Sequence, residues 1–71
     1  MKLSERQRQL RMVTRTLNEY YELIQYDRKY NNYGSMHMVH CSVYNDLKAE
    51  QRKLRSMTDE EFDKLQEQEN D

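Results

Sequence analysis

Two stripes of apolar residues, one in each half of the chain, constrain the fold most. The first stripe steps by three and four residues and consists of Leu10, Val13, Leu17, Tyr20 and Ile24. The second stripe follows a polar segment and consists of Met36, Val43, Leu47, Leu54 and Met57. Steps of three and four place side chains on one face of an α-helix. The two stripes therefore predict an all-α fold built on an antiparallel helical hairpin.

Capping signals set the limits of the first helix. Ser4 followed three residues later by Gln7 is typical of a capping box, so we expect a helix over residues 5–30. Residues 31–35 are expected to form the turn. Within that turn, Gly34 is the expected left-handed residue that ends the helix.

The second and third helices have their own signals. Ser35 is a suitable N-cap for a helix over residues 36–56. Thr58 and Glu61 have the spacing of a second capping box, which predicts a short acidic helix over residues 59–68. Part of the second helix has some β character, but a strand needs a pairing partner and the sequence offers none.

The two stripes also predict a register. If the chain folds back near Gly34, residues whose numbers sum to about 67 face each other across the hairpin. The predicted apolar pairs are Leu10–Met57, Val13–Leu54, Tyr20–Leu47 and Ile24–Val43. Two pairs depart from this pattern. Leu17 would face Glu50, and Asp27 would face His40. The second contact has two interpretations: a proton-sensitive carboxylate–imidazole pair, or a buried neutral His40 that bonds a backbone group instead.

The composition indicates a single small domain, residues 1–71, that is expected to associate with itself or with a partner. Hydrophobic residues make up 35% of the chain and charged residues another 35%. With so few apolar residues, a single hairpin would have only marginal folding stability. The single cysteine, Cys41, excludes an intrachain disulfide that could add to it. We therefore expect a homo-oligomeric helical bundle, most simply a dimer. No apolar run spans a bilayer, no signal peptide is present, and a free thiol suits a reducing compartment, so we expect a cytoplasmic protein without membrane contact.

Charge is divided between the open end of the hairpin and the tail. The basic residues of the open end are Arg6, Arg8, Arg11, Arg15, Lys48, Arg52, Lys53 and Arg55. The tail from Thr58 onward has seven acids and one base. We expect this acidic tail to fold onto the basic end, with Phe62 and Leu65 packing near Leu10 and Met57. Exposed ion pairs contribute only about 0–1 kcal/mol each, so the apolar pair must supply most of the docking energy.

The turn end is the expected binding surface. Its apolar side chains are too many for one helix–helix seam, and exposed patches of this kind mark interfaces. We expect a small non-enzymatic protein that binds and regulates or inhibits a macromolecular partner, in the manner of small phage or mobile-element proteins. The expected partner-binding residues are Tyr26, Tyr30, Tyr33, Met36, His37, Met38 and Tyr44.

Two other functions compete with protein binding. The first is nucleic-acid binding through the basic open end, with the expected contacts Arg8, Arg11, Arg15, Arg52 and Arg55. Against it stand the net charge of −1 and a tail placed to cover the basic residues. The second is an oligomeric sponge for a nucleotide-like small ligand, held in a tyrosine-lined site between protomers.

Catalytic and metal chemistry have little support in the sequence. No glycine-rich phosphate loop or nucleophile elbow is present, so we expect no catalytic residues and no cofactor. His37, His40 and Cys41 lie close in sequence, and His37 is one helical turn from Cys41. A structural zinc site needs four well-spaced ligands, and no second cysteine or further histidine pair exists. We therefore expect no metal site.

Overall fold

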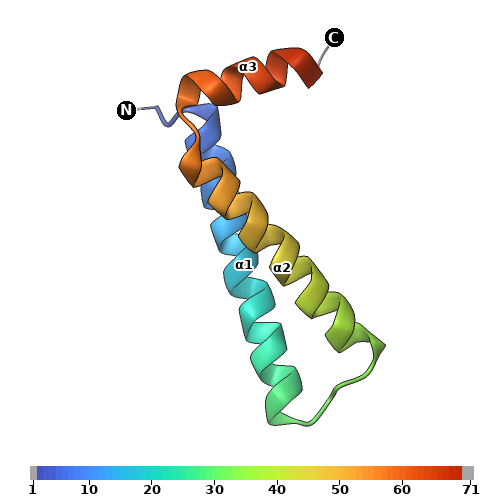
Figure 1. Ribbon diagram of the computed structural model, residues 1–71. Coiled ribbons are helices and arrows are strands. Elements are labelled where there is room, and N and C mark those ends of the chain that lie inside the picture. The colour runs from blue at the N-terminus through green and yellow to red at the C-terminus, as the bar shows by residue number, and fades with distance from the viewer. Residues whose placement is uncertain (1, 70–71) are drawn as a thin grey trace.

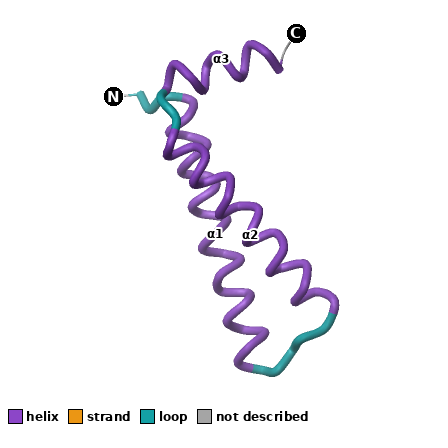
Figure 2. Tube along the Cα trace, viewed as in Figure 1, coloured by secondary structure: helices purple, strands orange, loops and turns teal. Residues whose placement is uncertain are grey.

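The computed structural model describes residues 2–69 and contains three helices. They are α1 (Glu5–Lys29), α2 (Ser35–Ser56) and α3 (Asp59–Glu69). The first two run antiparallel as a long hairpin, and α3 leaves its open end at a steep angle (Figures 1 and 2). No strand occurs in residues 2–69, so the all-α hairpin with a short acidic helix is confirmed for one chain.

The hairpin core is small and is built from both apolar stripes. Leu17 and Ile24 of α1 and Leu54 of α2 are buried. Between Leu17 and Leu54, the buried Gln51 donates from Nε2 to the hydroxyl of Thr14 at 3.1 Å, which links the two helices in the half of the hairpin nearer its open end. The predicted register paired Leu17 with Glu50. In the structure Glu50 is exposed to solvent, and the next residue, Gln51, is the one buried between the helices.

The turn differs from prediction in which residue takes the left-handed conformation. Asn31 has φ 53°, whereas Gly34 has φ −77°. Asparagine tolerates positive φ better than most residues, and here it lets the Asn32 amide donate to the Asp27 carbonyl at 2.7 Å. Gly34, not Ser35, occupies the N-cap position of α2. Ser35 is already helical, because the chain turns one residue earlier than the capping signal predicts.

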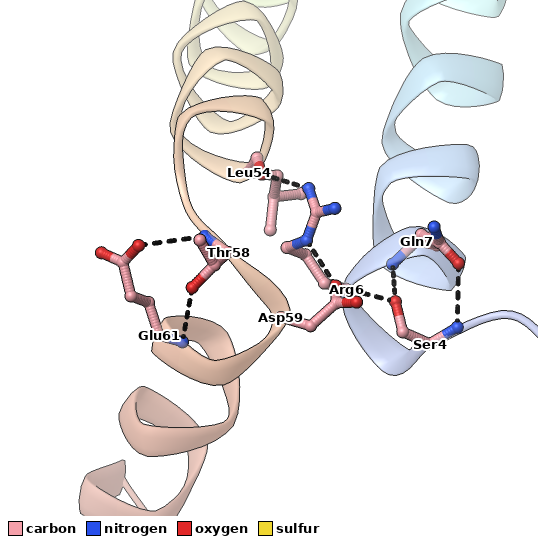
Figure 3. A network of polar contacts seen from close by, with 7 residues as sticks. All are labelled: Ser4, Arg6, Gln7, Leu54, Thr58, Asp59 and Glu61. Carbon is pink, nitrogen blue, oxygen red and sulfur yellow. Dashed lines mark hydrogen bonds and ion pairs between the residues drawn. The ribbon is translucent and has the colours of Figure 1, made fainter.

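Both predicted capping boxes are present at the open end. The Ser4 hydroxyl accepts from the Gln7 amide at 3.2 Å, and the Gln7 side chain accepts from the Ser4 amide at 3.0 Å. Thr58 and Glu61 exchange the same pair of bonds, each at 3.1 Å (Figure 3). Each box satisfies backbone donors that a helix start leaves free.

Arg6 joins the ends of the three helices (Figure 3). Its guanidinium donates to the Leu54 carbonyl at 2.8 Å, near the end of α2, and to Asp59 at 2.7 Å, at the start of α3. The Ser4 hydroxyl donates to the same Asp59 carboxylate at 3.0 Å. These bonds hold the pKa of Asp59 below its ordinary value, mainly through the Arg6 hydrogen bond and then that from Ser4.

The acidic tail docks by its first turns only. Phe62 is 3% exposed and lines a small crevice with Met57, as predicted, and with Leu54; the predicted neighbour Leu10 does not line this crevice. Leu65 borders the same crevice but remains 38% exposed. Along the described part of α3, Asp59 is the one acid that pairs with a base of the hairpin. The expected neutralisation of the whole basic end is therefore wrong, because α3 projects away from it (Figure 1).

Candidate functional site at the turn end

Large apolar side chains gather in solvent around the turn. We call this set the turn-end surface; it comprises Leu23, Tyr26, Tyr30, Tyr33, Met36, Met38 and Val39. The three tyrosines are each 57–58% exposed, and Met38 is 72% exposed. Tyr26 and Tyr30 are one helical turn apart on α1, and their ring centroids are 4.5 Å apart. The hairpin seam therefore leaves these side chains uncovered.

Two of the predicted partner-binding residues lie deeper than the rest. His37 and Tyr44 are half-buried, whereas the other five are exposed. Tyr44 lies beside Tyr21 of α1, with ring centroids 6.5 Å apart, and Lys48 reaches over its ring. His37 meets the edge of Tyr33 at 5.0 Å between centroids. These two residues thus link the turn-end surface to the seam.

A buried polar cluster lies in this part of the seam, where the helix axes diverge (Figure 1). Asp27 is 3% exposed, and one oxygen of its carboxylate, Oδ2, meets Nδ1 of His37 at 2.9 Å and Nδ1 of His40 at 3.0 Å. The ring of His40 also packs edge-on against Tyr20, with centroids 5.9 Å apart. A single acid of α1 thereby holds two rings of α2.

The charge state of Asp27 fixes the tautomer of both rings. The hydrogen bond with His40, then that with His37, holds the pKa of Asp27 below its ordinary value, although burial opposes this. Asp27 is therefore a carboxylate at neutral pH and can only accept hydrogen bonds. Each Nδ1 must then carry a proton and donate it. A neutral His37 consequently presents the lone pair of Nε2 on the other side of its ring.

Cys41 lies at that free nitrogen. Its Sγ is 3.5 Å from Nε2 of His37, one helical turn away on α2, and the residue is half-buried. Asp27 and Cys41 therefore contact opposite nitrogens of one ring and do not converge on a common point. Consistent with this, no group of three or more His, Cys, Asp or Glu side chains in residues 2–69 is arranged to hold a metal ion.

The sequence indicated half of this cluster. The register predicted the contact of Asp27 with His40, and helical spacing placed His37 beside Cys41. Sequence reasoning missed the bond between Asp27 and His37, which joins the two pairs into one cluster. The signal was present in the spacing: His37 and His40 are three residues apart and share a helix face, so a carboxylate that reaches one is near the other.

The predicted nucleic-acid-binding residues lie at the opposite end of the hairpin. Arg8, Arg11, Arg15 and Arg55 line one open surface groove of about 1030 Å³, which Glu19 and Glu22 also border. Arg52 is exposed on α2 and does not line the groove. In the described chain, Arg8 alone among these arginines has an acidic partner, Glu5 at 4.0 Å, and both side chains are well exposed.

A second, smaller crevice of about 250 Å³ runs between α1 and α2, and Tyr21 and Tyr44 form part of its lining. It is the nearest feature in one chain to the predicted tyrosine-lined ligand site, which stays a prediction.

No helix within residues 2–69 combines the length and apolarity needed to cross a bilayer. Comparison of the chain with protein-family models, curated proteins and solved structures gives no match.

Proposed function

We propose that the chain is a small non-enzymatic binding protein whose turn-end surface binds a partner protein and regulates or inhibits it. The observation that carries this proposal is the exposure of Tyr26, Tyr30, Tyr33, Met36 and Met38 around one end of the hairpin. Tyrosine and methionine bury a large area for few rotatable bonds and are common anchors at interfaces. The free thiol of Cys41 suits a reducing compartment such as the cytoplasm.

The size of the turn-end surface supports this proposal. Each of its larger side chains has on the order of 200 Å² of surface. Weighted by their exposed fractions, the seven residues together offer on the order of 800 Å² around the turn end. A typical stable interface buries about 800 Å² on each side, so this surface supplies most of one.

In the absence of another partner, the occupant we propose is a second copy of this chain. Two turn-end surfaces offer on the order of 1,600 Å² together, which is enough for the roughly 1,200–2,000 Å² that specific interfaces bury. A two-fold axis through the turn ends would place four helices side by side as a bundle. Sedimentation at micromolar concentration tests this: we expect a dimer, and a fully helical monomer would contradict it.

The binding proposal is tested by a matched pair of variants on the same helix. Tyr30→Ala removes an exposed anchor, and Arg11→Ala removes an exposed side chain at the far end of α1. Neither contributes to the core, so both variants should keep the helicity of the parent protein. Affinity capture from the native host, read by quantitative mass spectrometry, should lose the partner with Tyr30→Ala only. Loss with Arg11→Ala and retention with Tyr30→Ala would overturn the proposal.

Nucleic-acid binding is the second candidate, and the groove lined by four arginines favours it. Because α3 projects away, the acidic tail does not cover these side chains as the sequence led us to expect (Figure 1). Binding to generic duplex should weaken steeply as salt rises, because neutralised phosphates release counterions. Arg11→Ala should weaken it and Tyr30→Ala should not. No binding at low salt would remove this candidate.

A further inference from the structure

We propose that Cys41 is a nucleophilic thiol that accepts an acyl group from a thioester, with His37 as its base and Asp27 as the residue that positions the base. The proposal concerns one stoichiometric modification of this chain and does not depend on the proposed binding function. It is carried by the alignment of three side chains from two helices and by the exposed Met38 one helical turn from the thiol.

The three groups follow one another across a single imidazole ring. Oδ2 of Asp27 is 2.9 Å from Nδ1 of His37, and Nε2 of the same ring is 3.5 Å from Sγ of Cys41. A nucleophile, its base and a third group that orients the base form the arrangement that activates cysteine and serine in proteins. Helical spacing fixes one contact, because His37 and Cys41 are four residues apart on α2.

Asp27 sets the direction in which the proton moves. In the neutral form of His37, Nδ1 donates its proton to the carboxylate and the lone pair of Nε2 points at the thiol. When Nε2 takes the thiol proton, the imidazolium lies against a buried negative charge that stabilises it. The other groups in the immediate surroundings are His40, which shares Asp27, the edge of Tyr33 against His37, and Tyr20 against His40.

The surroundings of the thiol indicate the class of electrophile. Met38, one helical turn before Cys41 on the same side of α2, is 72% exposed. An acyl chain attached to Cys41 can lie against this side chain instead of in water, which favours the product. A thioester also needs no metal, oxidant or further co-reactant to transfer its acyl group to a thiol.

The step balances without outside reagents. His37 takes the proton of Cys41, and the thiolate attacks the thioester carbonyl carbon. The bond between this carbon and the donor sulfur breaks as the new carbon–sulfur bond forms. The proton held by His37 leaves with the donor thiol. One thioester is consumed and one is formed, with no change in oxidation state.

The first experiment measures the reactivity of the thiol with iodoacetamide at pH 6.5. The native protein should react at least about tenfold faster than the same chain unfolded in urea, since a positioned base contributes roughly a hundredfold or more. His37→Asn should remove the advantage, while the matched variant His40→Asn should keep most of it, because His40 bonds the same carboxylate but does not contact the thiol. A native thiol that reacts no faster than the unfolded one would overturn the proposal without any variant.

The second experiment tests the acyl donor. Incubation with hexanoyl-coenzyme A should add one hexanoyl group by intact mass, removable by hydroxylamine and absent in Cys41→Ser. Asp27→Asn should shift the pH profile of the reaction, while Asp46→Asn, which alters an exposed acid of the same helix as the thiol, should not. No adduct, an adduct in Cys41→Ser, or identical pH profiles would each overturn the proposal.

Discussion

The docking of α3 depends on one aromatic side chain, and Phe62→Ala tests this directly. Phe62 is 3% exposed, and burying such a side chain contributes about 1.5–3 kcal/mol. Removing a buried phenylalanine costs about 3–5 kcal/mol in larger cores. Here the cost should lie at or below the bottom of that range, since the crevice is open at one side and can partly collapse. We expect a loss of about 2–3 kcal/mol of docking free energy.

A loss of this size should release α3 as a helix. Isolated helices shorter than about 12–15 residues are marginal in water, and α3 has 11 residues. The helix is also rich in acids that repel each other once it leaves Arg6. Since α1 and α2 contribute 25 and 22 residues, far-ultraviolet ellipticity should fall by roughly a fifth. Amide hydrogen exchange should localise the loss to residues 59–69.

Leu65→Ala is the matched control for this variant. It removes an apolar side chain from the same helix and the same crevice, but Leu65 is 38% exposed. Its effect on ellipticity should be small. The reasoning is refuted if Phe62→Ala keeps full helicity, or if both variants lose α3 equally, because the buried ring would then not be what holds the helix.

Three further outcomes follow from the hairpin. Because the pKa of Asp27 is lowered in the folded protein, its contribution to stability is complete above the ordinary pKa of about 3.9 and disappears as pH falls through the lowered value. Between pH 5 and pH 2.5, urea unfolding should therefore show a smaller loss of unfolding free energy for Asp27→Asn than for the parent protein. Equal losses would contradict this role. Gly34→Ala should change thermal stability by less than about 0.5 kcal/mol: φ is −77° and a Cβ there meets nothing within 4 Å, but the lower entropy of the unfolded chain is offset by the poor N-cap preference of alanine. Asn31→Val should destabilise because φ is 53°. Thr14→Val should cost about 1–3 kcal/mol in chemical unfolding, because the buried amide of Gln51 loses its partner, and a stabilising Thr14→Val would refute that role.

Local signals made the helices predictable. Apolar spacing, Ser4 with Gln7, and Thr58 with Glu61 act over three or four residues, and the structure keeps all of them. The turn was harder, since Gly34 and Asn31 can both adopt positive φ and only the direction of the returning helix decides between them. A rule based on residue type alone chooses glycine.

Contacts that join several elements were the least predictable. Arg6 was one of eight bases at the open end, and its role emerges only where three helix ends meet. Asp27 was assigned one histidine because a register pairs residues one to one, yet one carboxylate oxygen accepts two donors. The position of α3 could not follow from charge, since exposed ion pairs are too weak to decide it.

The arrangement of the chain ends has a practical consequence. The molecule measures 44 × 29 × 18 Å, and the described ends at Lys2 and Glu69 both lie on the side away from the turn (Figure 1). A tag, dye or sensor-chip linkage attached at either terminus would therefore leave Tyr30 and its neighbours pointing outward. Immobilised in this way, every copy would present the same face to a solution of candidate molecules.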